Sequence, residues 1–204
     1  PHITSPYPDE SRPQERDHLN TGIFNLGYLG TRRTENTAQF LTWWKDRLRD
    51  HCYIDLANGM FVDQNWVNFA PVFYDDVHVS RHLGLNMAYW NLHERSITND
   101  QEPYEINGNT PLIFFHFSGY SPENPSEISK YQNRYSFQEK GDVATLFDYY
   151  AQALIKNGHH EYKKFPCFYI KPEIVAPRKR FLRVRKYVSM PFRWLVNFID
   201  SVQI

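Results

Sequence analysis

The feature that most constrains the fold is the alternation of apolar segments with helical spacing and apolar segments typical of strands. Within residues 34–50, positions 38, 41, 44 and 48 are apolar, which predicts an amphipathic helix with Thr34 at its N-cap. Residues 22–30, just before it, have the apolar and glycine content of a buried strand. Because strand and helix patterns alternate along the chain, we predict an α/β fold.

Further strand patterns occur in three segments: 77–79, 86–90 and 111–117, of which the last is the strongest. The pair Asn107-Gly108 predicts the turn of a hairpin. A short helix is predicted to begin at Asp63, because a carboxylate is favourable at a helix N-terminus. A longer helix is predicted over residues 142–157, with Gly158 just past its C-terminal end.

The composition favours a folded domain with a site for planar ligands. Of 204 residues, 17% are aromatic, which suits contact with carbohydrate. The length allows one domain or a domain fragment with a tail.

The two cysteines, Cys52 and Cys167, match no metal-binding spacing, and two thiols do not make the disulfide framework of a secreted protein. We therefore expect a reducing, cytoplasmic location. No run of 18 apolar residues and no signal peptide is present. The start Pro1-His2-Ile3-Thr4 lacks an initiator methionine, so we expect an excerpt of a longer polypeptide.

The net charge of zero conceals a basic C-terminal segment. Residues 163–204 contain ten Lys or Arg and two acids, a net charge of +8 that leaves −8 on the rest. Phe181, Val184 and Val188 recur there at helical spacing, which predicts a basic helix able to lie on an anionic membrane surface. The alternative is that its apolar residues pack on the main domain and its cations are solvated. We expect no nucleic-acid binding, because the acidic body would repel phosphates.

Four short polar segments attract a chemical interpretation. They are Phe24-Asn25-Leu26-Gly27, Asp63-Gln64-Asn65-Trp66-Val67-Asn68, Gly84-Leu85-Asn86 and His116-Phe117-Ser118-Gly119. Each is weak alone, because a lone histidine is commonly structural, an aspartate can cap a helix, and an asparagine can form a turn.

In this order the segments resemble retaining glycosyltransferases of the GT-A fold, the galactosyltransferase and glycogenin type of family 8. Phe24 to Gly27 match Phe-Asn-x-Gly, and Asp63, Gln64 and Asn68 match Asp-Gln-Asp-x-x-Asn. Asn86 matches Tyr-Asn loosely, while His116 and Gly119 match His-x-x-Gly-x-x-Lys-Pro. The phrases FNLGYLG, FVDQNW, AYWNLHER and FFHFSGYSP also resemble uncharacterised bacterial glycosyltransferase-like proteins. The resemblance covers about residues 1–135 and implies the C-terminal portion of a mixed-sheet GT-A fold.

The resemblance implies a role for each matched residue. Asn25, Asp63 and Asn86 would bind the donor sugar, and Gln64, with Asp63, would be catalytic beneath the anomeric carbon. His116 would ligate Mn²⁺ or Mg²⁺, and Gly119 would bind the diphosphate through its backbone. Such a cation neutralises the leaving diphosphate, and a site with imidazole and carboxylates suits manganese better than magnesium.

The chain departs from the family pattern in two places. No Asp-x-Asp occurs, and Asp75-Asp76 is out of order, so we expect the acidic motif upstream of Pro1. Pro122 stands where the family has lysine, which leaves Lys130 or Arg134 as the diphosphate-binding cation. Two further candidates are Arg32-Arg33, for which an exposed basic turn is the favoured explanation, and His93-Glu94-Arg95. The second group follows Tyr89-Trp90-Asn91, and whether it lines the acceptor pocket is left open.

We therefore expect three parts: residues 1–135 as the acceptor and metal side of the transferase domain, 136–170 as a helical extension, and 171–204 as a basic amphipathic tail. The expected function is sugar transfer from a nucleotide-diphosphate sugar to a carbohydrate or lipid-linked glycan acceptor, with retention. We expect a cytoplasmic location, with the tail as a candidate attachment to the inner membrane face. The alternative is a non-catalytic carbohydrate-binding or scaffold module that lost its metal site.

Overall fold

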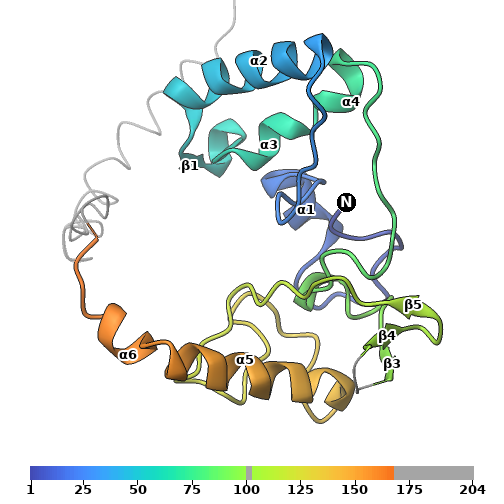
Figure 1. The fold of residues 1–204 in the computed structure, drawn as a ribbon, viewed down its shortest axis with the longest axis vertical. Coiled ribbons are helices and arrows are strands. Elements are labelled where there is room, and N and C mark those ends of the chain that lie inside the picture. The colour runs from blue at the N-terminus through green and yellow to red at the C-terminus, as the bar shows by residue number, and fades with distance from the viewer. Residues whose placement is uncertain (100–102, 168–204) are drawn as a thin grey trace, which may run out of the picture. The chain divides into compact units, whose positions relative to one another are not determined.

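A computed structural model describes residues 1–99 and 103–167 (Figure 1). The chain divides into two compact units, residues 1–160 and residues 161–204, and the account below concerns the first. The predicted basic tail, residues 171–204, lies outside the described residues. The predicted boundaries at 135/136 and 170/171 stay predictions.

The first half of the unit is mostly helical. Its helices are α1 (Glu15–Thr21), α2 (Glu35–His51), α3 (Gln64–Val67) and α4 (Ala70–Phe73), with a small antiparallel pair of β1 (Ile54–Asp55) and β2 (Met60–Phe61). The prediction of α2 is confirmed, because the Thr34 side chain accepts a hydrogen bond from the Thr37 amide at 3.2 Å. The short helix predicted at Asp63 is confirmed as α3.

An apolar group, here called the helical cluster, holds α2, α3 and α4 together. Its buried members are Phe40, Val67 and Ala70, packed against Phe24, Leu26, Trp43, Trp44 and Tyr74. The Phe40 and Trp44 rings stack with centroids 5.6 Å apart. Figure 1 shows α3 and α4 beside α2.

The second half of the unit is built around a larger apolar group, here called the central core. Its buried members are Met87, Leu92, Ile97, Ile106, Ile128, Val143, Leu146 and Phe147. They come from an antiparallel sheet in the order β3 (Ile97–Asn99), β4 (Glu105–Ile106), β5 (Thr110–Pro111), from helix α5 (Ala144–Lys156) and from the loops between them. Helix α6 (His159–Tyr162) follows α5.

Two sequence predictions are confirmed in this half. Asn107 and Gly108 form the β4–β5 turn with φ of 52° and 93°, left-handed values that asparagine and glycine tolerate. Helix α5 ends at Lys156, and Gly158 follows with φ of 86°, as expected for a residue just past a helix.

The strands predicted at 22–30, 77–79 and 86–90 are wrong. Amides of the first segment bind side chains instead of a neighbouring strand, as when Ile23 N donates to Asn68 Oδ1 at 3.0 Å. The prediction at 111–117 is only partly right, since beyond β5 the segment contributes one isolated parallel bridge, Met87 to Phe115. Side-chain acceptors far away in sequence therefore replace the strand partners that local patterns imply. The GT-A architecture stays a prediction.

No helix in residues 1–99 or 103–167 is long and apolar enough to cross a membrane. The predicted cytoplasmic location stays a prediction.

Candidate functional site

Four side chains from the four sequence segments form one hydrogen-bonded chain. Asn25 Nδ2 donates to Gln64 Oε1 at 3.1 Å, and Asn86 Nδ2 donates to Asn25 Oδ1 at 2.7 Å. His116 Nδ1 lies 3.0 Å from Asn86 Oδ1. We call these four residues the amide chain. The structure thus brings together Asn25, Gln64, Asn86 and His116, which are spread over 92 positions of the sequence.

Gly27 lies directly against the amide chain. A Cβ atom at this position would approach Asn86 Oδ1 to 2.7 Å, Asn25 Oδ1 to 2.8 Å and His116 Nδ1 to 2.9 Å. Each of these distances is too short for a carbon contact, so a side chain would displace the polar groups. The glycine of the Phe24 to Gly27 segment is therefore required by the close approach of the backbone to the site.

Local backbone geometry explains how Asn86 enters the site. Asn86 has φ of 57°, a left-handed conformation that asparagine adopts more readily than most residues. The adjoining backbone pairs with the segment that carries His116, since His116 N donates to Met87 O at 2.7 Å. The segments that carry Asn86 and His116 are therefore joined by backbone hydrogen bonding, and Met87 anchors them in the central core.

His2 joins the amide chain at Asn25. Its Nε2 lies 3.3 Å from Asn25 Nδ2 and its Nδ1 lies 3.3 Å from Ile23 O, so a proton on Nδ1 satisfies both contacts. Burial, with a further effect from nearby His18, lowers the pKa of His2 to about 3. The neutral ring therefore accepts from Asn25 throughout the physiological range.

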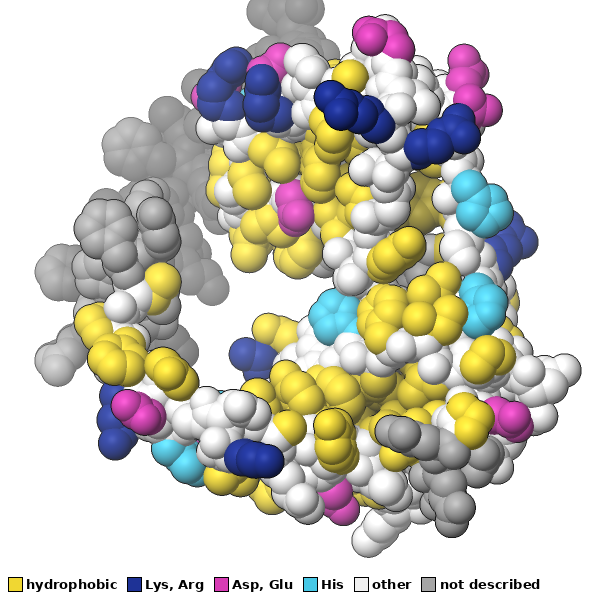
Figure 2. Space-filling model, in the orientation of Figure 1, with side chains coloured by type: hydrophobic (Ala, Val, Ile, Leu, Met, Phe, Trp, Pro, Cys, Tyr) yellow, Lys and Arg dark blue, Asp and Glu magenta, His cyan; other side chains and the backbone are white. Residues whose placement is uncertain are grey.

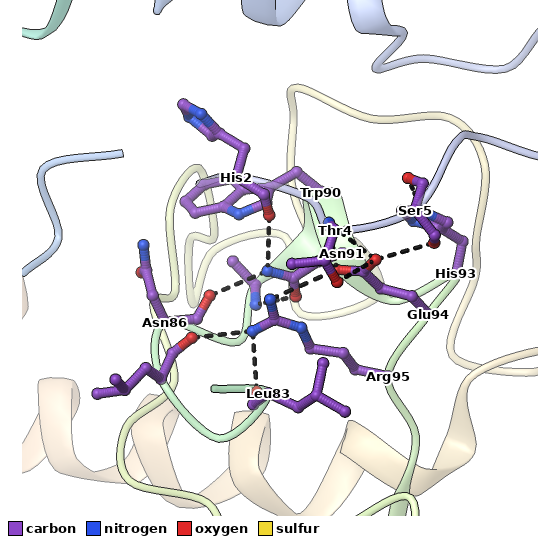
Figure 3. Close-up of polar contacts among 12 residues, drawn as sticks. His2, Thr4, Ser5, Leu83, Asn86, Trp90, Asn91, His93, Glu94 and Arg95 are labelled. Carbon is purple, nitrogen blue, oxygen red and sulfur yellow. Dashed lines mark hydrogen bonds and ion pairs between the residues drawn. The ribbon is translucent and has the colours of Figure 1, made fainter. Parts of the chain in front are cut away.

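Trp90 and Asn91 tie His2 to the rest of the site (Figure 3). Asn91 Nδ2 donates to His2 O at 3.1 Å and to Asn86 O at 3.0 Å, and its Oδ1 accepts from the Ala88 amide at 2.9 Å. The Trp90 ring meets the His2 and His116 rings edge-on, with centroids 5.2 and 5.1 Å away. These contacts join His2, Asn86 and His116 through the neighbouring residues Trp90 and Asn91.

Arg95 and Glu94 fix the backbone beneath Asn86 (Figure 3). Arg95 Nη1 donates to Leu83 O at 2.9 Å and Leu85 O at 2.8 Å, and Nη2 pairs with Glu94 Oε1 at 3.4 Å. Burial lowers the pKa of Arg95, and Glu94 opposes that shift. Burial would raise the pKa of Glu94, but hydrogen bonds from the Thr4 and Ser5 side chains outweigh it and lower that pKa.

A cleft of about 750 Å³ opens beside the amide chain. That volume lies within the range of pockets that bind small molecules. Asn25 and Asn86 line it, whereas Gln64 and His116 are not among its lining residues. The remaining walls mix aromatic, cationic and acidic side chains: Phe24, Tyr28, Tyr74, Arg32, Arg95, Asp75, Asp76, His78 and His82.

Other predicted site residues lie apart from the amide chain. Asp63 is half-buried at the start of α3, and only its backbone oxygen is engaged, by Trp44 Nε1 at 3.2 Å. Gly119 has φ of 76°, and Lys130 is exposed with Nζ 5.0 Å from the Tyr131 ring centroid. Arg134 is buried and pairs with Asp9 at 3.1 Å, which makes it a structural cation. None of these four lines the cleft.

The geometry of His116 fits a metal ligand in one respect. Asn86 donates through Nδ2 to Asn25, so its Oδ1 faces His116 and requires the proton on Nδ1. The Nε2 lone pair is then available, which is the arrangement that orients metal-binding histidines. Burial also lowers the pKa of His116, which favours the neutral ring. Among the residues described, no cluster of three ligand-type side chains includes His116, so further ligands must be supplied.

Comparisons with known proteins give relatives but no function. The chain is similar to two Bacillus subtilis (strain 168) proteins named as uncharacterized: YfnF, 27% identical over 109 residues, and YfnD, 31% identical over 111 residues. Each alignment covers 53% of this chain and 36% or 35% of the relative, so the match spans about a third of those proteins. No family model matches the chain. No solved structure matches it.

Proposed function

We propose that this chain supplies the sugar-binding side of a glycosyltransferase acting on a nucleotide-diphosphate-sugar donor and a glycan acceptor. The observation that carries the proposal is the amide chain, in which Asn25, Gln64, Asn86 and His116 meet beside a cleft. The order of their segments is the order in the family that the sequence resembles.

The chemistry of the cleft suits a sugar. Asn25 and Asn86 place amides at its edge. Both N–H groups of Asn25 bind His2 and Gln64, and its Oδ1 accepts from Gly27 and Asn86, so Asn25 orients Asn86. Asn86 commits one N–H to Asn25 and one contact of its Oδ1 to His116, so its amide retains a donor and an acceptor position for a hydroxyl group. Phe24, Tyr28 and Tyr74 provide aromatic surface, which can cover the apolar face of a pyranose or a base. Arg32 is a cation in the cleft wall that could pair with a diphosphate, whereas Arg95 is engaged by Glu94 and by two backbone carbonyls.

His116 would hold the cation through Nε2, and Mn²⁺ or Mg²⁺ bound there would supply charge neutralisation of the leaving diphosphate. Asn86 holds the His116 ring in the required tautomer. Gln64 is buried, and its Oε1 accepts hydrogen bonds from Asn25 and from the Leu26 amide. Gln64 thus acts in this arrangement as a positioning residue for Asn25. A direct role beneath the anomeric carbon would require it to leave both partners.

A non-catalytic carbohydrate-binding module is the second candidate. It is favoured by the fact that the Asn86 amide, oriented by Asn25, can bind hydroxyls without a cation, while His116 lies in no three-ligand cluster of the described residues. Both candidates use the same cleft, so turnover is the property that separates them.

The test is a screen of nucleotide-diphosphate sugars with the complete encoded polypeptide, followed by His116→Ala. Under the enzyme proposal this variant lowers turnover by about 100-fold or more, equivalent to about 3 kcal/mol of lost transition-state stabilisation, and changes the Mn²⁺ dependence. His51→Ala, at the end of α2 and outside the cleft, is the matched control. Thermal unfolding verifies that both variants fold.

Full activity of His116→Ala with unchanged Mn²⁺ dependence contradicts the site assignment. If no donor is turned over, but glycan binding is measurable and is lost in Asn25→Ala, the chain is a binding module.

A further inference from the structure

We propose that Glu123, His159 and His160 form a Zn²⁺ site, separate from the amide chain and independent of the proposed function. One ligand atom from each of the three side chains lies within 4.8 Å of the others. In the part of the chain that the structure describes, they are the group of three His, Cys, Asp or Glu residues with this spacing.

The local backbone explains why the three side chains meet. Helix α5 ends at Lys156, and Gly158, at φ of 86°, turns the chain so that α6 begins with His159 and His160. Glu123 lies in a turn closed by the Asn124 amide donating to Ser121 O at 3.0 Å. His159 Nε2 lies 2.9 Å from Glu123 Oε1, which joins the end of α5 to that turn.

The Glu123 carboxylate is already oriented. The Ser121 hydroxyl donates to Glu123 Oε2, while Oε1 faces His159. Hydrogen bonds to the outer oxygen of a ligating carboxylate are a usual support of metal ligands. His160 lies beside His159, with ring centroids 5.4 Å apart.

Two imidazoles and a carboxylate are a typical ligand set for zinc. Zinc binds nitrogen and carboxylate oxygen at about 2.0–2.2 Å, so its ligands lie roughly 3–4 Å apart. The present spacing of up to 4.8 Å needs only a small rotation, which exposed side chains such as Glu123 and His160 can make. Three protein ligands leave a fourth position for water.

A simple ion pair between His159 and Glu123 is the competing explanation. It needs no contribution from His160, whereas a zinc site does. His160→Ala therefore separates the two, because it leaves the ion pair intact and removes one zinc ligand.

The experiment is calorimetric titration of the untagged 204-residue chain with ZnCl₂. Cys52 and Cys167 are exposed thiols that could bind zinc themselves, so all variants carry Cys52→Ser and Cys167→Ser. We expect one zinc per chain, and binding weaker by about tenfold or more in His159→Ala, His160→Ala and Glu123→Gln, since even outer partners of a metal site contribute that much. Matched controls are His78→Ala and Glu127→Gln, exposed residues outside the cluster.

Thermal unfolding gives a second readout. At a fixed zinc concentration, zinc that binds the folded state raises the unfolding temperature of the thiol-free parent and of the controls, and raises that of His160→Ala by less. Absence of zinc binding in the thiol-free parent overturns the proposal. So does unchanged affinity in the three cluster variants, or an equal loss in the two controls.

Discussion

The central core and the helical cluster differ in how completely they exclude water. Six of the eight buried residues of the central core keep 0–2% of their surface exposed: Met87, Leu92, Ile106, Ile128, Val143 and Phe147. The other two, Ile97 and Leu146, keep 7% and 8%, as much as the helical cluster, in which Phe40, Val67 and Ala70 keep 6–8%. Beside the helical cluster, Val72 is 74% exposed and Phe73 is 54% exposed. Figure 2 shows apolar side chains on the surface of this helical part of the molecule.

The difference matters because the amide chain takes residues from both parts. Gln64 begins α3 beside the helical cluster, and Asn25 follows Phe24 of that cluster. Asn86 and His116 adjoin Met87 and Phe115 of the central core. The site therefore joins a firmly packed part to a less completely buried one, and its geometry depends on hydrogen bonds across the join.

The largest expected effect is that of Phe147→Ala compared with Phe40→Ala. Phe147 makes edge-on contacts with four aromatic rings at centroid distances of 5.0–5.3 Å: Phe115, Phe117, Tyr120 and Phe137. We expect losses in free energy of unfolding of about 5 kcal/mol for Phe147→Ala and about 3 kcal/mol for Phe40→Ala, which keeps 8% of its surface exposed against 2% for Phe147. Urea unfolding of both variants measures this, and equal losses would remove the contrast between the two parts.

Asn91→Ala is expected to cost about 2–3 kcal/mol of unfolding free energy, because it leaves a buried amide and two carbonyls without partners. Asn91 is fully buried, whereas Asn65 on α3 is half-buried and donates to Asn20 O and Gly59 O. Asn65→Ala should therefore cost about 1 kcal/mol, since water can replace its bonds. Chemical denaturation of both variants tests whether burial determines how much unfolding free energy is lost. A larger loss for Asn65→Ala than for Asn91→Ala would contradict that dependence on burial.

Acid should destabilise the contacts of His2 and His18 first. Burial is the main cause that lowers the pKa of His2 to about 3 and of His18 to about 4, so both rings are neutral when folded and protonate near pH 6.5 when unfolded. Below pH 6.5 the unfolded chain therefore binds more protons than the folded chain. The contribution of the two neutral rings to the free energy of unfolding is complete above pH 6.5, and it falls by about 1.4 kcal/mol per ring for each pH unit toward pH 4.

Urea unfolding at pH 7, 6 and 5 measures that slope. His18→Gln should lower the slope of unfolding free energy against pH by about half, because one of the two titrating rings is removed. An unchanged slope would show that His18 does not contribute to the acid destabilisation. His78→Gln, an exposed residue, provides the control.

The smallest expected effect concerns the start of α2. Thr34→Ala removes the acceptor for the Thr37 amide and should cost about 1 kcal/mol of unfolding free energy. Arg49→Ala, at the other end of the helix, breaks only surface pairs with Asp46 and Asp50 and should cost less. Thermal unfolding compares the stability losses of the two variants. A larger loss for Arg49→Ala would mean that the Thr34 cap stabilises α2 less than the surface ion pairs do.

The predictions that the structure confirms are those that depend on neighbouring residues. Helix α2 with its Thr34 cap, the Asn107-Gly108 turn and the end of α5 before Gly158 each rest on contacts within a few positions. The strand at 22–30 failed because its amides bind Gln64 and Asn68 side chains, which no local pattern reveals.

For the candidate site, the family resemblance selected Asn25, Gln64, Asn86 and His116, which the structure brings together, but also Asp63, Gly119 and Lys130, which lie apart from them. The chemical roles of all these residues stay predictions. No sequence pattern pointed to His2, which lies in a proline-rich polar segment, and Asn91 was visible only as part of an aromatic and polar cluster. Their contact joins positions 89 residues apart.

The amino-acid sequence alone therefore determined α2, α3 and α5, the Asn107-Gly108 turn and the set of polar residues available for chemistry, because propensities, caps and spacing act over short distances. Tertiary structure decided that Gln64 faces Asn25 instead of the cleft, that Gly27 must lack a side chain, and that His116 carries its proton on Nδ1. Each of these depends on which distant donor or acceptor satisfies a buried polar group. Only the folded chain fixes that pairing, because leaving such a group unpaired costs about 1–3 kcal/mol.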